Sequence, residues 1–244
     1  LLASVNLPTK DEHDVRLCIS AGEPLPSDLL TRWQGTFGVD ILDGLGTTEM
    51  LHIFVSNRPD EITPGSTGRV VPGYQIRLIN DNNEVCAPGE MGVLEVSGPS
   101  SALMYWGQRQ KTKDTFKGTW TRTGDNYSIS EKGVMTYGGR NDDMLKVGGI
   151  YVSPFEVEAA LIKHEAVLEA AVVGSNDQDG LVKPKGFIVL NKNFTGSDEL
   201  ASELINFVKI NLAEYKYPRW IEFLDELPKT ATGKIQRFKL RTAS

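Results

Sequence analysis

Four short glycine-rich segments, at 43–49, 123–125, 138–149 and 230–234, each carry between one and four charged residues. Glycine lets a backbone approach a ligand closely or adopt a positive φ, so a charged side chain beside it can reach a small polar molecule. One such segment is usually only a turn. Four of them in one chain indicate a site for a small polar ligand, of which a nucleotide is one example.

The motifs of several common chemistries are missing from the sequence. Ser66 lacks the first glycine of a nucleophile elbow, and Lys234 is not part of a Walker A loop. The glycines at 44–46 are not followed by the third glycine of a dinucleotide fingerprint. The three histidines are not at metal-ligand spacing with one another or with cysteine: His13, His52 and His164.

Read together, the segments resemble the signature segments of the acyl-adenylate-forming superfamily, which contains acyl-CoA synthetases, peptide-synthetase adenylation domains and luciferases. Residues 44–49 (Gly-Leu-Gly-Thr-Thr-Glu) are similar to its Tyr-Gly-x-Thr-Glu loop, and 120–125 (Trp-Thr-Arg-Thr-Gly-Asp) to its aromatic-x-Arg-Thr-Gly-Asp segment. Residues 139–146 resemble its hinge segment, and 228–234 (Pro-Lys-Thr-Ala-Thr-Gly-Lys) its lysine loop. Four matches in the right order are far more specific than any one alone.

Two stretches, 43–57 and 146–156, further resemble benzoate-CoA ligases. The resemblance implies a ligase that uses ATP with Mg²⁺ and takes CoA as a substrate. A carboxylate, benzoate or a related aryl acid, attacks the α-phosphate of ATP and gives acyl-AMP and pyrophosphate. The CoA thiolate then attacks the acyl carbon and expels AMP.

The resemblance implies catalytic roles for Lys234, Glu49 and Thr48. Glu49 matches the Mg²⁺ ligand, because a carboxylate suits a metal that prefers oxygen, and Thr48 matches a phosphate or metal contact. Lys234 matches the adenylation lysine, whose charge would bridge the carboxylate and α-phosphate oxygens. The alternatives are helix-terminal roles for Glu49 and Thr48. For Lys234 the alternative is membership of a solvated basic tail with Lys229, Arg237, Lys239 and Arg241.

Further residues match the nucleotide site. Asp125 matches the acceptor of the ribose hydroxyls and Arg140 a second ribose contact, with an Asx-turn and a surface salt bridge as the alternatives. Two segments match the lining of the adenine site, although plain βα turns would also explain them: Ala21, Gly22, Glu23, Asp43 and Gly44.

The remaining residues concern movement, CoA and the acid. Asp142 matches the hinge about which a C-terminal domain swings between the half-reactions, although a solvated turn would also explain it. Lys146, with Gly148 and Gly149, matches the segment beside which pantetheine passes; the alternative for the two glycines is a β-hairpin turn. The pair His52 and Ile53 lies where benzoate-type ligases line the acid pocket, and a core histidine is the alternative.

The hydrophobic pattern predicts the elements that position these residues. A strand over 15–19, a helix over 29–37 and a strand from Ile41 are typical of an α/β domain. Short alternating runs between turns predict a β-rich, barrel-like part over 65–141. Ser153 and Pro154 mark a helix start, with Glu156 placed for a capping box.

The predicted fold class is therefore α/β and α+β. Residues 1–64 would end an α/β nucleotide-binding N-terminal domain, and 65–141 would be its β-rich subdomain. Residues 142–244 would form a small mobile α+β C-terminal domain that carries the lysine. Because the chain starts at Leu1 without an initiator Met, we expect sequence to be missing upstream; this missing segment and a second copy in a homodimer are the partner hypotheses.

Composition narrows the function classes. The 244 residues are 40% hydrophobic and carry a net charge of −6, which disfavours a nucleic-acid partner. No apolar run approaches the length of a membrane span. Cys18 and Cys86 make no disulfide framework, which favours a reducing, cytoplasmic setting.

Two other functions remain open beside the CoA ligase. One is an adenylation domain that loads a carrier protein. The other is a non-catalytic nucleotide-binding module. Acetylation of Lys234 would remove its charge, so regulation at that residue is a further hypothesis.

Overall fold

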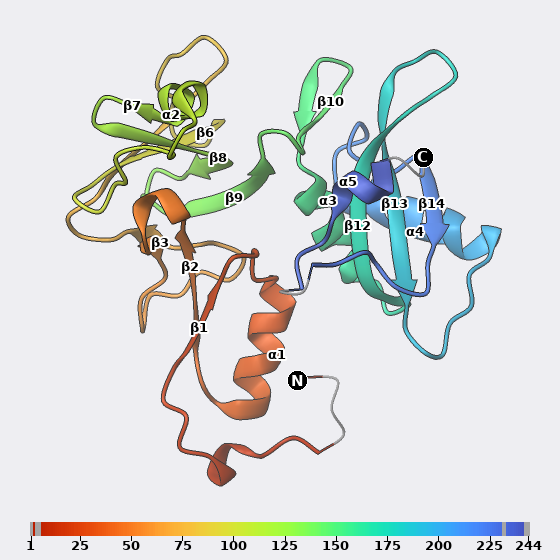
Figure 1. The fold of residues 1–244 in the computed structure, drawn as a ribbon. Helices are drawn as coiled ribbons and strands as arrows, with labels where there is room; N and C mark the ends of the chain where they lie inside the picture. The colour runs from red at the N-terminus through yellow and green to blue at the C-terminus, as the bar shows by residue number, and fades with distance from the viewer. Residues whose placement is uncertain (1, 3–5, 231–232, 242–244) are drawn as a thin grey trace. The chain divides into compact units, whose positions relative to one another are not determined.

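A computed structural model describes residues 2, 6–230 and 233–241. The opening residues Leu1 and Ala3–Val5, and Ala231 and Thr232 of the predicted lysine loop, lie outside these ranges. The chain divides into two compact units, Leu1–Tyr137 and Gly138–Ser244 (Figure 1). They are called the first and the second unit below.

The first unit begins with a four-stranded sheet in the order β1-β2-β3-β4. Its strands are β1 (Cys18–Ala21), β2 (Ile41–Gly46), β3 (Ile53–Ser56) and β4 (Arg69–Val70), and a short 3-10 helix, η1 (Lys10–Glu12), precedes them. β1 and β2 are parallel and joined by α1 (Ser27–Phe37), which runs beside them in Figure 1. α1 buries Leu30 and Phe37 and ends at Gly38 in the left-handed conformation, φ 64°, which glycine adopts without strain.

The first strand differs from the predicted one, 15–19. β1 starts only at Cys18, because its partner β2 begins opposite at Ile41. Val15 and Leu17 are therefore left 51% and 41% exposed. Strand pairing, which the hydrophobic pattern does not encode, decides where the strand starts.

The second sheet of the first unit has the order β5-β6-β8-β7, with β9 on β8. Its strands are β5 (Gln75–Ile79), β6 (Met91–Ser97), β7 (Phe116–Lys117), β8 (Trp120–Ile129) and β9 (Met135–Arg140). The helices η2 (Thr48–Met50) and α2 (Arg109–Thr115) complete the unit. Alternate residues of the strands point into a core with η2 and β3, including Met50, Phe54, Leu94, Val96 and Met135. The predicted β-rich texture is present here.

The second unit is a three-stranded sheet with helices on both faces. It opens with the hairpin β10 (Leu145–Val147) and β11 (Ile150–Val152), and the sheet has the order β12-β13-β14. The sheet strands are β12 (Val167–Asn176), β13 (Val182–Leu190) and β14 (Trp220–Phe223), and the helices are α3 (Pro154–Ile162), α4 (Asp198–Asn211) and α5 (Arg237–Arg241).

Residues that alternate along β12 serve two different cores. Ala170 and Val172 pack with α3 and α4, whereas Ala171 and Val173 pack with Leu240 of α5. Because side chains of a strand point alternately to opposite faces, the sheet is covered on both sides. This explains why these strands read as continuous apolar runs.

At the start of α3, one of the two predicted capping interactions is present. The Glu156 amide donates to the Ser153 hydroxyl at 3.3 Å, and Pro154 occupies the first turn. The Glu156 carboxylate accepts from the Lys216 ammonium at 2.6 and 2.7 Å. The expected reciprocal capping box is replaced by this ion pair, since a lysine distant in sequence competes for the same carboxylate.

Both cysteines are free and half-buried. Among the helices of the described residues, none combines the length and the hydrophobicity that crossing a membrane demands.

The packing around Gly68 gives a stability prediction. Gly68 has φ 88°, and a Cβ there would lie 2.2 Å from the Ser56 carbonyl oxygen, whereas Gly73, at φ 94°, has open space around it. Gly73→Ala should cost about 1–2 kcal/mol of unfolding free energy for the left-handed backbone alone. Gly68→Ala should cost about 1–3 kcal/mol more for the backbone clash. Urea unfolding followed by tryptophan fluorescence measures both, and equal losses would contradict the clash.

Candidate active site

The predicted adenine segments meet at the carboxyl ends of β1 and β2. Ala21 and Gly44 are register partners in this parallel pair, and Gly22 follows with φ 92°. Glu23 is exposed. Ligands of α/β sheets bind outside the carboxyl ends of parallel strands, so the place of these residues suits a ligand.

Asp43 lies one residue before Gly44 on β2 and is only 6% exposed. Burial raises the pKa of its carboxyl to about 7, although hydrogen bonds from the Gly44 and Leu25 backbone and from the Thr67 side chain oppose the shift. Its Oδ1 atom has no hydrogen-bond partner within the described residues. A buried acceptor without a partner is costly, so a ligand donor at this position would be favourable.

Asp125 on β8 is 8% exposed, and its amide donates to the Thr123 hydroxyl at 3.1 Å. Two residues further, Tyr127 lies with its hydroxyl 3.4 Å from the Thr67 hydroxyl. Burial raises the pKa of Tyr127, and the charges of Asp125 and Asp43 raise it further. The structure therefore brings these two carboxylates, which are 82 residues apart in sequence, to the same tyrosine.

Glu49 lies half-buried in η2. Its carboxylate accepts a hydrogen bond from the Tyr105 hydroxyl, and its carbonyl oxygen accepts from the Ala102 amide at 2.7 Å. Burial alone would raise the pKa of this carboxyl, but the Tyr105 hydrogen bond and the nearby charge of Lys111 help to bring it below the ordinary value. Glu49 is thus held as an anion. Thr48 is exposed, and the N-cap of η2 is Thr47, so the capping alternative for Thr48 does not hold.

Close packing against β3 can by itself explain why glycine occupies positions 44 and 46. A Cβ at Gly46 would lie 2.7 Å from the His52 carbonyl oxygen, and one at Gly44 would lie 3.0 Å from the Ile53 side chain. These glycines allow β3 to pair closely with β2. Their presence in the sequence therefore does not by itself require a ligand.

His52 is exposed, so the alternative of a core histidine is wrong. Its Nε2 lies 3.0 Å from the Tyr74 hydroxyl, and its Nδ1 lies 2.7 Å from the Ile53 carbonyl oxygen. The Tyr74 hydroxyl also lies 2.7 Å from the Ser100 hydroxyl, which donates to the Met50 carbonyl. This chain of hydrogen bonds fixes the imidazole, with Ile53 half-buried next to it.

Residues 139–149 belong to the second unit. The Arg140 Nε donates to the Asp142 carboxylate at 3.3 Å, and the two side chains are 52% and 74% exposed. An exposed pair of this kind contributes little to stability. Gly148 and Gly149, at φ 57° and 87°, form the two-residue turn between β10 and β11, in which Lys146 pairs with Tyr151. The turn requires positive φ at both positions, which accounts for two glycines.

Lys234 is exposed on a loop closed by the bridge between Lys229 and Ile235. Its amide donates to the Thr230 hydroxyl at 3.1 Å, and its carbonyl accepts from the Thr230 amide at 2.8 Å. Other basic residues of the supposed tail are in ion pairs: Lys229 with Glu169, Arg237 with Glu158 and Arg241 with Asp143.

No such ion pair is found for the Lys234 ammonium among the residues that the structure describes. The basic residues near the end of the chain are therefore not one uniform solvated tail. Lys234 is set apart from its neighbours as a charge that is available to a ligand.

Comparison with known proteins decides the family. Sequence profiles match the chain as AMP-binding enzyme over residues 1–106 and as AMP-binding enzyme C-terminal domain over residues 156–234. The benzoate–CoA ligase of Thauera aromatica is 59% identical over 244 residues, 100% of this chain and 46% of that protein. The chain belongs to the AMP-binding enzymes. It spans about half the length of the curated relatives that it matches.

Solved structures of AMP-binding enzymes have the same fold. A benzoate CoA ligase from Burkholderia xenovorans LB400 matches with a TM-score of 0.92 and 54% identity, over 98% of this chain and 48% of that one. The anthranilate CoA ligase AuaEII in complex with anthranoyl-AMP matches with a TM-score of 0.90 and 51% identity, over 94% and 44%. The predicted superfamily and fold class are thereby confirmed.

The residues present fit the groups that an AMP-binding enzyme uses. Mg²⁺ is usually held by one or two carboxylates together with substrate phosphates. Within the described ranges, no group of three or more His, Cys, Asp or Glu could hold a metal ion. A single anionic Glu49 beside a polyphosphate fits this mode of binding, and the unpartnered Asp43 oxygen fits a nucleotide donor.

Sequence reasoning missed three residues that contribute to this candidate site: Thr67, Tyr105 and Tyr127. The Tyr105 and Thr67 hydroxyls hydrogen-bond to the predicted carboxylates Glu49 and Asp43, and the Tyr127 hydroxyl contacts that of Thr67. Tyr127 lies two residues after Asp125 on β8, so strand periodicity could have placed it on the same face. Nothing in the sequence links Tyr105 to Glu49, because 56 residues separate them.

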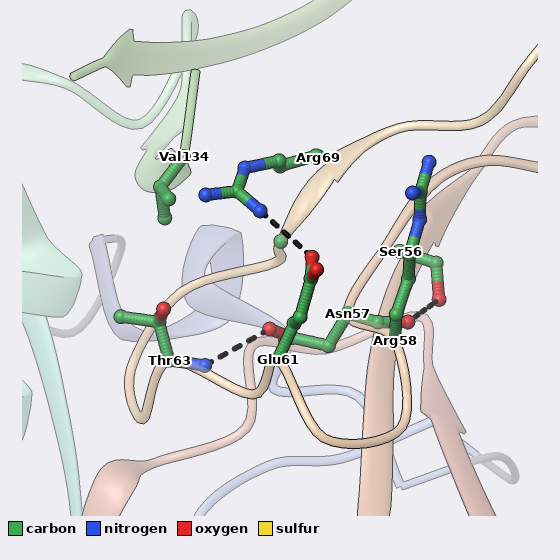
Figure 2. A pocket seen from close by; sticks show the side chains of 8 residues that line it. Ser56, Asn57, Arg58, Glu61, Thr63, Arg69 and Val134 are labelled. Carbon is green, nitrogen blue, oxygen red and sulfur yellow. Dashed lines mark hydrogen bonds and ion pairs between the residues drawn. The ribbon is translucent and has the colours of Figure 1, made fainter. Parts of the chain in front are cut away.

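A separate small hollow contains none of the predicted site residues. Figure 2 shows Arg69 paired with Glu61 across it, and the Asn57 side-chain Oδ1 accepting from the Thr63 backbone amide. The residues lining it are Ser56, Asn57, Arg58, Glu61, Thr63, Gly68, Arg69 and Val134. The buried Asn57 amide is satisfied on both sides by the chain itself, so no vacant polar group points to a ligand here.

Asp43 should make the stability of this chain depend on pH. Because its folded-state pKa of about 7 lies above the ordinary 3.8, the folded state keeps the proton longer. The free energy of unfolding should then fall as the pH rises from about 4 to about 7, by as much as about 4 kcal/mol. Asp43→Asn removes this term, so the variant should gain on the wild type from pH 4 to pH 8.

The measurement is urea unfolding at several pH values. Asp114→Asn serves as the control, because Asp114 is exposed and its hydrogen bond from the Gln110 amide can be kept. A stability difference between Asp43→Asn and wild type that stays constant with pH would contradict the raised pKa.

Proposed function

We propose that the protein to which this chain belongs is an AMP-forming carboxylate–CoA ligase that acts on benzoate or a related aryl acid. The observation that supports this best is the contact of the Thr67 and Tyr127 hydroxyls at 3.4 Å, beside two buried carboxylates: Thr67 hydrogen-bonds to Asp43, and Tyr127 lies two residues after Asp125 on β8. The chain is also 59% identical to a benzoate–CoA ligase. Because the chain spans 46% of that relative, the activity is proposed for the whole protein.

In the proposed reaction, the chain's own residues hold the nucleotide and balance its charge. Asp125 accepts hydrogen bonds from the ribose hydroxyls, because a carboxylate can take both protons. The adenine lies beside 21–23 and 43–44, where the free oxygen of Asp43 accepts a hydrogen bond. Mg²⁺, when bound at Glu49, neutralises phosphate charge.

Lys234 supplies the charge that the first step needs. Joining a carboxylate to the α-phosphate brings two anions together, so a cation must stabilise the developing negative charge. The Lys234 ammonium is exposed, and its loop is closed by backbone hydrogen bonds. It can therefore bridge the two groups without first breaking an ion pair.

The second step uses the other predicted residues. Asp142 and Arg140 form the hinge and the second ribose contact; their weak, exposed pair suits a segment that changes conformation. The turn at Gly148 and Gly149, next to Lys146, lies beside the pantetheine. Residues 1–64 and 65–141 act as the two parts of the N-terminal domain, and 142–244 acts as the mobile C-terminal domain.

The acid is proposed to be an aryl carboxylate that contacts His52 and Ile53. The imidazole is oriented by Tyr74, and Ile53 offers an apolar contact next to it. An upstream segment of the same protein, a second copy in a homodimer and a cytoplasmic setting complete the proposal. Loading of a carrier protein in place of CoA, and nucleotide binding without catalysis, are the competing functions.

Lys234→Ala in the complete enzyme tests the proposal. It should reduce acyl-AMP formation by roughly 100-fold or more, because an oriented charge in the transition state is lost. Transfer of the acyl group from preformed benzoyl-AMP to CoA should change by less than about threefold, since that step does not need this charge. Pyrophosphate release and thioester formation are measured separately.

Lys192→Ala is the matched control, because Lys192 is an exposed lysine of the same unit. It should leave both steps unchanged. An equal loss of both steps in Lys234→Ala would contradict the role given to Lys234. A thioester formed only on a carrier protein would favour the competing adenylation domain.

A further inference from the structure

The loop that carries Lys234 is fastened at both ends by ion pairs to the sheet and helix behind it. Before the loop, the Lys229 ammonium donates to the Glu169 carboxylate of β12 at 2.6 Å. After the loop, Arg237 donates to Glu158 of α3. Both pairs lie within the second unit.

The two pairs differ in burial. Lys229 and Glu169 are 38% and 35% exposed in their side chains, whereas Arg237 and Glu158 are 8% and 7% exposed. Solvent screens the first pair, so it holds the loop weakly. The second pair is shielded from water and is much harder to separate, because either partner alone would be a buried charge.

Glu158 is satisfied on every side by fixed groups. Its Oε1 accepts from the Val172 amide of β12 at 2.7 Å and from the Arg237 Nη2 at 3.0 Å, and its Oε2 accepts from the same nitrogen at 2.8 Å. The Arg237 guanidinium also lies 4.2 Å above the Phe155 ring. A guanidinium held by a carboxylate and an aromatic face has a fixed orientation.

This anchor lies very near the lysine. Arg237 is three positions after Lys234, and three extended residues reach at most about 11 Å. The buried Leu227 and Leu240 also hold the ends of this segment, but apolar contacts restrain position more than direction. The ion pair also fixes the direction in which the chain leaves the core towards Lys234.

We propose that Glu158 and Arg237 are positioning residues that hold the Lys234 loop for adenylation. The adenylation step that this pair would serve rests on the proposed function. The anchoring of the loop by the pair does not. A misplacement of about 1 Å can cost on the order of 100-fold in rate, so loosening the pair should be measurable. Since thioester formation does not use Lys234, that step should be spared.

Arg237→Lys is the most informative variant, because it keeps the charge and loses the planar fork. In the complete enzyme, kcat for acyl-AMP formation should fall by roughly 10–100-fold, with KM for ATP and for the acid changed by less than about threefold. Transfer from preformed benzoyl-AMP to CoA should stay within about threefold. Glu158→Asp should show the same selective loss, because the shortened carboxylate no longer reaches both partners.

Arg77→Lys is the matched control. Arg77 donates from two nitrogens to the Glu95 carboxylate, which is 3% exposed, but this pair belongs to the first unit. The same chemical change there should leave the ratio of the two half-reactions as in the wild type. A similar selective loss in Arg77→Lys would remove the special role of Arg237.

Amide hydrogen exchange supplies a readout that does not depend on activity. Exchange over 228–237 should be faster in Arg237→Lys, because the Gly233 amide donates within the loop to Thr230 and the Gln236 amide donates to Pro228. The amides of β12 and β13 should keep their protection. Arg77→Lys should leave exchange over 228–237 unchanged.

The outcomes separate the two proposals. Unchanged exchange over 228–237 in Arg237→Lys would overturn the anchoring role, whatever the activity. Faster exchange with an equal loss of both half-reactions, or with no loss, would reduce the pair to a structural one. If the wild-type enzyme released no AMP with any acid, the proposed function would fail, and the exchange data would still decide whether the pair holds the loop.

Discussion

The contact between the residues just before β4 and the start of β9 determines the geometry of the candidate site. The Thr67 amide donates to the Met135 carbonyl at 2.9 Å, and the Met135 amide donates to the Gly68 carbonyl at 2.8 Å. These bonds join the first sheet of the unit, which carries Asp43, to the second sheet, which carries Asp125. The Thr67 hydroxyl then meets Tyr127 across the junction. This pairing therefore adds backbone hydrogen bonds to the apolar core that the two sheets share.

The parts of the fold that could be predicted from sequence are those that local residues determine. Alternation of apolar residues marks the β-rich part, and the helix starting at Pro154 follows from local capping by Ser153. Partners distant in sequence could not be predicted in this way. β1 starts at Cys18 because β2 determines its length, and the Glu156 carboxylate binds Lys216 because tertiary packing brings that lysine within reach.

The site residues divide in the same manner. Glycine-rich signatures predicted roles for Glu49, Asp125 and Lys234, because motifs are local in sequence. The hydroxyls of Tyr105 and Thr67, which hydrogen-bond to Glu49 and Asp43, belong to no motif and emerged only from the folded structure. Several glycines have structural reasons as well: Gly46 accommodates the His52 backbone, and the pair at 148–149 forms a hairpin turn. A glycine-rich loop is therefore a poor guide to the ligand until its packing is known.

Product analysis with the complete enzyme tests most directly whether a carboxylate is activated by adenylation. ATP, Mg²⁺ and CoA would be supplied with benzoate, a hydroxybenzoate, acetate or a medium-chain fatty acid. The prediction is acid-dependent release of AMP and pyrophosphate, with one acyl-CoA formed per AMP and benzoate or another aryl acid preferred. Formation of ADP, or the absence of AMP release with every acid, would contradict the central claim. Preference for acetate or the fatty acid would keep the mechanism and overturn the aryl specificity.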